Sequence, residues 1–394
     1  MLIYNSLLTS QLLTNHMNFK TTLISVLFIT LSIPINAQEV PLQKTSLVGN
    51  RIVEFIPKGF DKSKTPSLIL ASEPKSKGKV PLDWTLIPEF RFQNNKAGAV
   101  LKLQGNISLY GGGEVTGPLL RNGQSIKLWN TDTGAYSVEG GKRLYQTHPW
   151  VMGVRPDGSA FGIIFDSTWK AELITNSDQI IYNSEGALFR VYIIDRESPQ
   201  EVIKGLSELT GTIKLPPRWA LGYHQCRFSY DSEKRVMEIA DTFREKKIPC
   251  DVIWMDIDYM QGYRVFTFDS IRFSNPKRLN DNLHKKGFRA VYMIDPGVKV
   301  DKDYDVYQSG SQNSVWVMKN NGEEYHGKVW PGDCVFPDFT DPKTRNWWGG
   351  LYKDFLNTGI DGVWNDMNEP AVNDNDFPED TRLGTMPYNT PHKG

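Results

Sequence analysis

The segment CDVIWMDID, residues 250–258, joins a short apolar run to acidic side chains. The run at residues 252–255 predicts a buried β-strand. Side chains alternate along a strand, so Trp254, Asp256 and Asp258 are expected to share one face. The strand would therefore place a tryptophan beneath carboxylates, although a strand that enters a core has no need of acids at its tip.

The same arrangement recurs further along the chain. The segment RAVYMIDPG, residues 289–297, is a third predicted strand, and it runs into Asp295. The segment GIDGVWNDMNE, residues 359–369, is a fourth, and alternation places Trp364 and Asp366 on one of its faces. A tryptophan again lies beneath an acid.

Strands and helices alternate through this half of the sequence. Besides the strands above, a first strand is predicted at residues 219–228, and helices are predicted at 232–247, 275–287 and around 347–355. The glycines Gly287 and Gly359 end the last two helices. A long loop is predicted at about residues 297–340. Alternating strands and helices imply a parallel sheet, either doubly wound or closed as a (β/α)₈ barrel.

The strand ends decide between these two architectures. Three of the four predicted strands end in acids, at Asp256 and Asp258, at Asp295 and at Asp366. No glycine-rich phosphate loop follows the first strand, which weakens a dinucleotide-binding fold. In a barrel, residues at the carboxyl ends of the strands point into the active site. The sequence thus predicts a pocket with an acidic floor and aromatic walls.

The preceding part of the chain has a different pattern. Residues 38–213 contain short alternating segments, such as SLILAS at 67–72 and FGIIFDS at 161–167, separated by Gly, Asn and Asp. This pattern is typical of an all-β sandwich. The prolines Pro216 and Pro217 stiffen the connection that follows. We therefore predict a β-sandwich domain at 38–213 and a barrel domain at 214–394.

The N-terminal segment has the layout of a secretory signal peptide. Lys20 precedes an apolar run at residues 23–35, and Ala37 offers a small residue for cleavage. Met17 is a plausible true start. The run is short for a membrane span, although an uncleaved anchor is the alternative. We expect residues 1–37 to be removed, the protein to be periplasmic or extracellular, and no stable membrane insertion.

Composition narrows the possible partners. The chain has 394 residues, with 45 basic and 45 acidic side chains and no long basic run, so nucleic acid is not an expected partner. The cysteines Cys226, Cys250 and Cys334 are odd in number, which implies no disulfide framework, and we expect all three to be buried thiols. No spacing with histidine suggests a metal site, and no cofactor is expected.

Carboxylates combined with aromatic side chains suggest sugar chemistry. Glycosidic cleavage passes through an oxocarbenium-like state, which a carboxylate can attack or stabilise. Ionised carboxylates also bind sugar hydroxyls strongly, and aromatic faces suit the apolar faces of sugars. The alternative is structural, with the acids capping helices or bridging loops. Three acidic strand ends together favour a site.

Several motifs resemble glycoside hydrolase family 31. The segment GVWNDMNEP, residues 362–370, resembles the nucleophile signature of that family. Five further segments resemble motifs of the family and occur in the same order along the chain, before this signature. They are YGGGEVTGPLLRNGQSIKLWNTD (110–132), GYHQCRFSY (222–230), DVIWMDIDYMQGYRVFTFD (251–269), MIDPGV (293–298) and VWPGDCVFPDFTDP (329–342). The family includes retaining α-glucosidases and α-xylosidases, with a galactose-mutarotase-like β-sandwich before a (β/α)₈ barrel. The resemblance covers most of residues 100–370.

The resemblance implies roles for individual residues. Asp366 matches the catalytic nucleophile, and Glu369 is expected either to orient it or to make structural hydrogen bonds only. Asp256 and Asp258 are expected to be buried supports without direct substrate contact. The residues that match substrate-binding positions are Asp132, Trp254, Asp295, Trp330, Trp364 and Met367. Among these, Asp132 and Asp295 would bind hydroxyls, the tryptophans would form walls, and Met367 would border the pocket.

The resemblance also implies that part of the family's site lies outside this chain. In the family, the general acid/base, an arginine and a histidine follow the nucleophile, on later strands. Only four of the eight strands of a barrel are visible in residues 214–394. That segment is also shorter than the about 250 residues that a full barrel needs. We therefore expect the N-terminal portion of a longer enzyme, inactive alone, with the acid/base beyond residue 394.

The function that follows is a retaining hydrolase that acts on α-glucosides at the non-reducing end, through a covalent intermediate on Asp366. Its substrate would be an α-linked oligosaccharide or glucoside. The alternatives are an α-xylosidase, a transglycosylase or a glucan lyase of the same family, or a catalytically dead sugar-binding fragment. Linkage preference and oligomeric state do not follow from the sequence.

Overall fold

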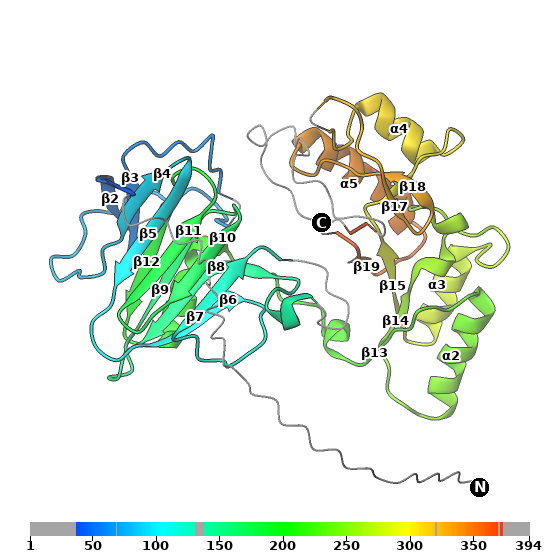
Figure 1. The fold of residues 1–394 in the computed structure, drawn as a ribbon. Helices are drawn as coiled ribbons and strands as arrows, with labels where there is room; N and C mark the ends of the chain where they lie inside the picture. Colours follow the sequence, from blue (N-terminus) through cyan, green and yellow to red (C-terminus); the bar gives the residue numbers. More distant parts are fainter. Residues whose placement is uncertain (1–36, 68, 131–137, 320, 369–370, 373–394) are drawn as a thin grey trace, which may run out of the picture. The chain divides into compact units, whose positions relative to one another are not determined.

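The computed structural model describes residues 37–67, 69–130, 138–319, 321–368 and 371–372. These residues form a two-sheet β region, drawn in blue to green in Figure 1, and then an α/β region, drawn in yellow-green to red. Within these ranges, no helix is both long enough and apolar enough to cross a lipid bilayer.

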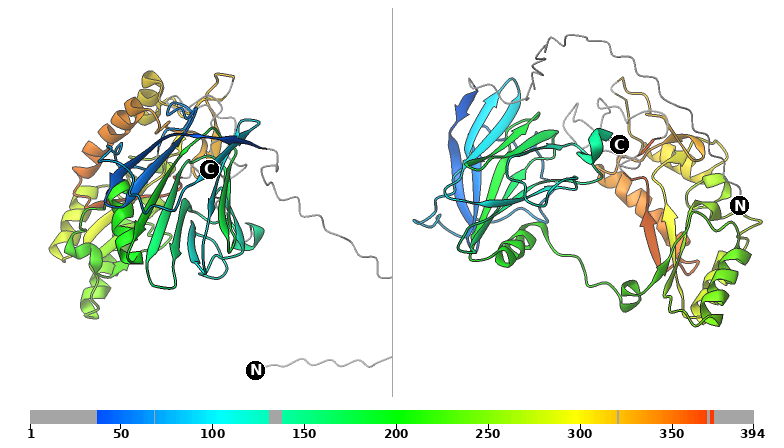
Figure 2. Two further views of the ribbon diagram at one scale, coloured as in Figure 1. Left: turned by 90° about the vertical axis from the view of Figure 1, so that its left-hand side faces the viewer. Right: turned by 60° about the horizontal axis from the view of Figure 1, so that its bottom comes forward.

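The β region consists of two six-stranded antiparallel sheets (Figure 2). The first has the order β1 (Gln38–Val40), β4 (Glu89–Gln93), β5 (Lys96–Lys102), β11 (Gln179–Ser184), β10 (Ala171–Thr175), β7 (Gln124–Leu128). The second has the order β2 (Leu42–Gly49), β3 (Ile52–Pro57), β12 (Arg190–Arg196), β9 (Ala160–Asp166), β8 (Thr147–Val154), β6 (Ser108–Gly113). Side chains from both sheets share one hydrophobic core, which agrees with the predicted sandwich.

The strands β9 and β12 of the second sheet carry apolar side chains on both faces, and the structure shows why. In β12, Val191 and Ile193 point into the core between the sheets. The alternate residues Tyr192 and Ile194 belong to a second cluster, on the outer face. The helix α1 (Pro199–Thr210) covers that face with Val202 and Leu209. A strand buried on both sides has no polar face to display, which explains the continuous apolar runs of β9 and β12.

Two predictions within this region are wrong. The helix α1 was not expected, because the whole region read as β. Its signals are nevertheless present, since Ser198 caps the helix and Pro199 opens it. The segment SLILAS at 67–72 contains no strand among its described residues. Its side chains Ile69 and Leu70 instead pack against the outer cluster. The apolar residues are therefore partly buried although the backbone is irregular.

The cap of α1 gives a direct stability test. We expect Ser198→Ala to lower the free energy of unfolding by about 1 kcal/mol, because the amide of Glu201 loses the hydroxyl that accepts its hydrogen bond. Urea unfolding of the chain measures the change. The matched control is Ser207→Ala on the exposed side of the same helix, with an expected change within about 0.5 kcal/mol. Equal losses in the two variants would contradict the capping role.

The α/β region is built on four parallel strands. Their order is β13 (His224–Gln225), β14 (Val252–Met255), β15 (Arg289–Ile294), β19 (Gly362–Asn365). Between them along the chain lie α2 (Glu233–Glu245), α3 (Pro276–Lys285), α4 (Asp305–Asn313) and α5 (Pro342–Leu356). The alternation of strands and helices is as predicted. Within the described residues the sheet is open and does not close into a barrel.

One face of this sheet is covered by the helices. Ile253 and Met255 of β14 share a cluster with Val236 of α2, Leu283 of α3 and Phe355 of α5. The hydroxyl of Tyr292 on β15 reaches through this layer and donates to Asn280 Oδ1 on α3 at 2.9 Å. Since strand side chains alternate, Trp254 emerges from β14 on the opposite face.

The first strand is much shorter than predicted. Instead of a strand over 219–228, the structure has a 3₁₀ helix at Arg218–Leu221 and then β13, with only two residues. The cause lies in the pairing, because β13 forms a ladder with β14 alone, through His224 and Gln225. An apolar pattern indicates burial, but a strand also needs a neighbour along its whole length.

The long loop predicted at about 297–340 is structured. It contains β16 (Val298–Lys299), α4 (Asp305–Asn313), β17 (Gly327–Val329) and β18 (Gly332–Val335). The three strands form a small antiparallel sheet in the order β16-β18-β17. Strands of two to four residues are too short to show a period in the sequence.

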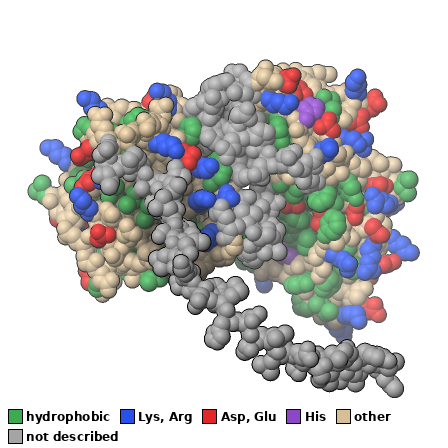
Figure 3. All heavy atoms as spheres, in the orientation of Figure 1, with side chains coloured by type: hydrophobic (Ala, Val, Ile, Leu, Met, Phe, Trp, Pro, Cys, Tyr) green, Lys and Arg blue, Asp and Glu red, His purple; other side chains and the backbone are tan. Residues whose placement is uncertain are grey.

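Charged side chains of both signs are interspersed on the surface drawn in Figure 3, with scattered hydrophobic ones between them. The mixture agrees with the equal numbers of basic and acidic residues in the sequence. A surface of this kind creates no large field of one sign on that face.

Candidate active site

Three acidic residues follow three neighbouring strands at the same edge of the parallel sheet. Asp256 follows β14, Asp295 follows β15 and Asp366 follows β19. The amide of Asp366 donates to the Ile294 carbonyl at 3.1 Å, which continues the β15–β19 pairing one residue past the strand end. The carboxyl ends of parallel strands meet at one edge, so these acids gather there.

Trp254 and Trp364 each lie two residues before an acid of this edge, Asp256 and Asp366. The rings of Trp254 and Trp364 are 5.7 Å apart between centroids, with an interplanar angle of 69°. This edge-to-face contact lets the positive rim of one indole meet the negative face of the other. Both side chains are only partly buried, so the aromatic layer is accessible from the face of the sheet opposite the helices.

Asp256 follows β14 and is largely buried at this edge of the sheet. It is 9% exposed, and its Oδ1 accepts a hydrogen bond of 2.7 Å from the amide of Ile257, the first residue of a 3₁₀ helix at Ile257–Tyr259. Burial raises the pKa of Asp256, and the charges of Asp366 and Asp258 raise it further. The charges of Asp366 and Asp256 act on each other although β15 lies between the two strands that precede them.

The position of Asp258 differs from the prediction. It was expected on the same strand face as Trp254 and Asp256, but β14 ends at Met255 and the chain turns into the 3₁₀ helix. A helix of three residues per turn does not keep the two-residue alternation of a strand. The carboxylate of Asp258 accepts a hydrogen bond from the Tyr263 hydroxyl at 3.3 Å.

Asp295 is deeply buried, with 4% exposure. It lies near the small sheet that follows β15. Burial raises the pKa of the Cys334 thiol to about 12, and the carboxylates of Asp333 and Asp295 contribute to the shift. Burial likewise raises the pKa of Tyr259, with a contribution from Asp295.

One cysteine is not where we expected it. Cys250 and Cys334 are buried, as predicted, but Cys226 is exposed. The prediction placed it late in a long strand, whereas β13 ends one residue earlier, at Gln225. Partial desolvation and the negative charges of Asp256 and Asp366 raise the pKa of the Cys226 thiol. Cys226 follows β13, which pairs with β14, and none of the three cysteines forms a disulfide.

Of the remaining predicted site residues, Met367 and Trp330 belong to the described part of the chain. Met367 follows Asp366 with a φ of +55° and packs against the cluster around the small sheet. Trp330 lies in the turn between β17 and β18 and is 47% exposed. Asp132 and Glu369 lie outside the described residues. The structure therefore brings Trp254, Trp364 and the strand-end acids together, and places Trp330 on a separate sheet.

The sequence interpretation missed His224, on β13. The indole Nε1 of Trp254 donates to Nδ1 of His224 at 3.1 Å. The residue lies two positions before Cys226, within the quoted segment GYHQCRFSY. Its place on the first strand was visible in the sequence, but its partner was not, because the hydrogen bond joins residues thirty positions apart.

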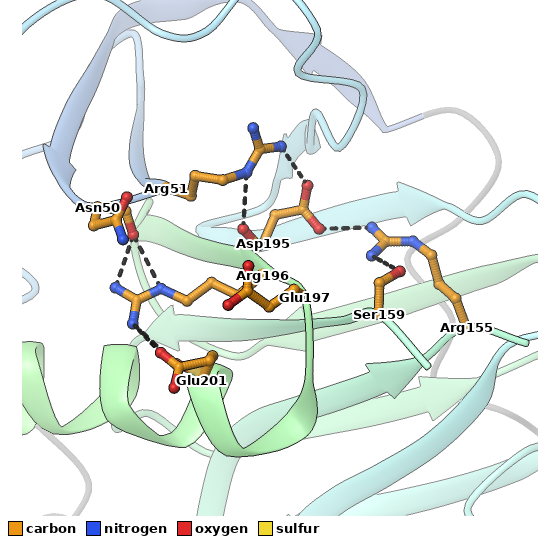
Figure 4. A pocket seen from close by; sticks show the side chains of 8 residues that line it. All are labelled: Asn50, Arg51, Arg155, Ser159, Asp195, Arg196, Glu197 and Glu201. Atoms are coloured by element: carbon orange, nitrogen blue, oxygen red, sulfur yellow. Dashed lines mark hydrogen bonds and ion pairs between the residues drawn. The ribbon is translucent and has the colours of Figure 1, made fainter. Parts of the chain in front are cut away.

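A pocket of about 360 Å³ lies elsewhere, on the sandwich (Figure 4). Its lining consists of Asn50, Arg51, Arg155, Ser159, Asp195, Arg196, Glu197 and Glu201. The carboxylate of Asp195 joins Arg51 and Arg155 at 2.9 and 2.8 Å. Arg196 donates to the Asn50 carbonyl at 2.8 Å. These arginines are held by the protein's own acceptors, so the pocket is a structural ion network between two hairpins and α1.

Both regions match domains of one family. Residues 213–393 match the "Glycosyl hydrolases family 31 TIM-barrel domain", and residues 63–173 match the "Glycosyl hydrolase 31 N-terminal galactose mutarotase-like domain". Together the two matches cover more than half of the chain. These two matches, which agree with the acidic strand ends of the α/β region, show that the chain belongs to glycosyl hydrolase family 31.

Named relatives agree with this assignment. The chain is 48% identical over 265 residues to "Alpha-glucosidase 2" of Bacillus thermoamyloliquefaciens, covering 67% of this chain and 34% of the relative. It is similar to the crystal structure of a family 31 α-glucosidase from Bacteroides thetaiotaomicron, with a TM-score of 0.66 and 64% identity, over 71% of this chain and 47% of the other. A Flavobacterium johnsoniae family 31 dextranase complexed with glucose gives a TM-score of 0.75 at 25% identity, over 88% of this chain and 48% of that one. The chain spans about a third of the length of the curated relatives it matches.

Proposed function

We propose that this chain contributes the nucleophile half of a retaining α-glucosidase that removes glucose from the non-reducing end of α-glucosides. The observation that carries the proposal is the gathering of Asp256, Asp295 and Asp366 at the carboxyl edge of the parallel sheet, above the Trp254–Trp364 pair. Curated relatives that are named α-glucosidases support the substrate class.

In this mechanism the carboxylate of Asp366 attacks the anomeric carbon and forms a glycosyl ester, while the bond to the leaving-group oxygen breaks and that oxygen takes a proton from the general acid. A water molecule then gives a proton back to the same group, now acting as base, hydrolyses the ester and regenerates the carboxylate. Asp256, at the same edge of the sheet, would be a buried support of the site without direct contact to the substrate. Glu369 would orient the nucleophile.

The remaining site roles follow the family pattern. Trp254, Trp364 and Trp330 would form aromatic walls, and Met367 would border the pocket. Asp295 and Asp132 would bind sugar hydroxyls by charge-assisted hydrogen bonds. The dextranase neighbours, whose structures were determined with glucose and with isomaltotriose, support a subsite for glucose units.

We place the general acid/base after residue 394, in the part of the barrel that this chain does not contain. The parallel strands β13, β14, β15 and β19 would be the first four of eight. We call a protein in which this chain is followed by the rest of that barrel the parent enzyme. In the same scheme the domains span 38–213 and 214–394, and residues 1–37 form a signal peptide. N-terminal sequencing of the exported protein tests the last point, with a start at residue 38 expected.

Covalent trapping tests the function. We expect 5-fluoro-α-glucosyl fluoride to inactivate the parent enzyme, and peptide mass mapping to find the sugar on Asp366. The ring fluorine slows both steps, whereas the fluoride leaving group speeds only the first, so the glycosyl ester accumulates. Product analysis on maltose separates the rivals: hydrolysis gives glucose, a transglycosylase gives longer sugars, and a lyase gives an anhydro sugar. Label on another carboxylate, or faster turnover of α-xylosides, would refute the proposal.

A further inference from the structure

The hydrogen bond between Trp254 and His224 links the first two strands of the sheet. The distance from Trp254 Nε1 to His224 Nδ1 is 3.1 Å, and the two ring centroids are 5.8 Å apart with an interplanar angle of 36°. His224 is in register with Val252, two residues before Trp254 on β14. Residues in register on parallel strands point to the same side, so both rings emerge from the face opposite the helices.

This geometry fixes the proton of the imidazole. An indole N–H can only donate, so Nδ1 of His224 must carry a lone pair. The proton of the neutral ring is then on Nε2. That atom is buried, and no group among the described residues accepts from it. Nδ1, the one acceptor of the neutral ring, therefore accepts from Trp254. A doubly protonated ring has no acceptor and could not make this bond.

Trp254 in turn contacts Trp364 edge to face, at 5.7 Å and 69°. Trp364 lies on β19, two residues before Asp366, and is in register with Met293. The energy of an edge-to-face pair depends on the angle between the rings. A hydrogen bond at the Nε1 atom of Trp254 limits rotation of that indole, and so it fixes the edge that Trp254 presents to Trp364.

We propose that His224, as the Nε2–H tautomer, is a positioning residue that holds Trp254 at the angle required for the aromatic wall below the acids. The proposal rests on the proposed function only in assigning the wall to a sugar subsite. A wall contacts the sugar in the ground state and in the transition state alike, so its loss raises KM more than it lowers kcat.

Two substitutions of similar size separate the hydrogen bond from packing. In His224→Asn the side-chain Oδ1 can lie where Nδ1 was and accept from the indole, whereas His224→Leu offers no acceptor. In the parent enzyme we expect His224→Leu to lower kcat/KM for p-nitrophenyl α-glucoside by about tenfold, mostly by raising KM. A factor of about ten corresponds to the net contribution of one hydrogen bond. His224→Asn should stay within about threefold. Equal values for the two variants would overturn the proposal.

A spectroscopic readout works without turnover. Two indoles in close contact give an exciton couplet in far-ultraviolet circular dichroism, and the difference between wild type and Trp364→Phe isolates the couplet of the Trp254–Trp364 pair. We expect His224→Leu to weaken this couplet and His224→Asn to keep it. An unchanged couplet in His224→Leu would overturn the proposal, whether or not the parent enzyme cleaves α-glucosides. A wild type that binds and cleaves no α-glucoside but shows the expected couplets would refute the proposed function alone.

A third variant guards against misfolding. If His224→Leu unfolds the protein, His224→Gln replaces it, because the longer side chain carries its oxygen toward the Nε2 position and away from Trp254. It keeps a polar group on β13 yet lacks an acceptor at the Nδ1 position. We expect His224→Gln to behave as His224→Leu in KM and in the couplet. A His224→Gln protein with wild-type KM and couplet would overturn the proposal.

Discussion

Replacement of Asp366 by alanine should abolish turnover in the parent enzyme, with kcat lower by roughly 10⁴–10⁶-fold, as for other catalytic nucleophiles. The physical reason is that no other group can form the covalent intermediate at the same face of the sugar. The residue lies at the end of β19, and its side chain is only partly buried, so the substitution leaves no large cavity. We therefore expect the fold to persist, with an unchanged circular dichroism spectrum.

Chemical rescue makes this test specific. Azide can enter the space left in Asp366→Ala and attack the anomeric carbon of p-nitrophenyl α-glucoside, whose leaving group needs little help from an acid. We expect azide to restore part of the release of p-nitrophenol and to yield β-glucosyl azide. That product has the inverted configuration, which identifies the face on which the missing carboxylate acted.

The matched control is Asp354→Asn on the exposed side of α5. It also removes one carboxylate from the α/β region, and we expect kcat within about twofold of wild type, as for surface changes in general. Activity of Asp366→Ala within tenfold of wild type would remove Asp366 from the mechanism, and a rescue product with retained configuration would do the same.

The second large effect is on stability. We expect Arg190→Met to lower the free energy of unfolding of the sandwich by about 3–5 kcal/mol, which is the usual result of breaking a buried ion pair by removing one partner. Arg190 is 2% exposed and donates to Asp166 at 2.9 Å and to Glu54 at 3.3 Å. Asp166 and Glu54 are 2% and 5% exposed. Without the guanidinium, two buried carboxylates have lost their counter-charge.

The acceptors in this network are bound from more than one side. The hydroxyl of Ser67 donates to Asp166 Oδ1 at 2.7 Å, and that of Tyr192 donates to Glu54 Oε1 at 2.7 Å. Burial raises the pKa of Asp166, and Ser67 and Arg190 oppose the shift. Removing Arg190 therefore raises the pKa further. Since the penalty of an unpaired carboxylate is present above its folded-state pKa and is relieved below it, the deficit of Arg190→Met should shrink as pH falls.

Urea unfolding, followed at several pH values, measures the loss. The control is Lys62→Met, because Lys62 pairs with Glu73 at 2.8 Å, and Arg190 also pairs with Glu73, but Lys62 is 60% exposed. We expect Lys62→Met to change stability by less than about 1 kcal/mol. Adding Asp166→Asn to Arg190→Met should recover part of the loss. A deficit in Arg190→Met as small as that in Lys62→Met would show that the network does not stabilise the sandwich.

The periodic parts of the fold were predictable from the sequence. Alternating apolar residues predicted the two-sheet region, and the helical spacing of Val236, Ala240 and Phe243 predicted α2. The acids at strand ends predicted an edge where carboxylates gather, because parallel strands have their carboxyl ends together whatever the details of packing. The roles assigned to Asp366 and its neighbours remain predictions.

The errors share a cause. The helix α1 was overlooked because its apolar residues follow a strand buried on both sides. The segment 67–72 was taken for a strand because Ile69 and Leu70 pack against the same outer cluster as the helix. Burial has the same appearance in a short sequence whether the backbone is a strand, a helix or irregular. Strands as short as β16 have no period to detect.

The alternation of the four parallel strands with α2, α3 and α5, the acids after apolar runs and the motifs of family 31 could be predicted, because each is recorded in neighbouring residues. The folded structure was needed to show that Asp258 leaves the strand face, that Cys226 is exposed beyond a two-residue strand, and that His224 accepts a hydrogen bond from Trp254. Where a strand ends, and which side chain meets which, depends on the neighbour across the sheet. That neighbour is distant in sequence, so no local pattern records it.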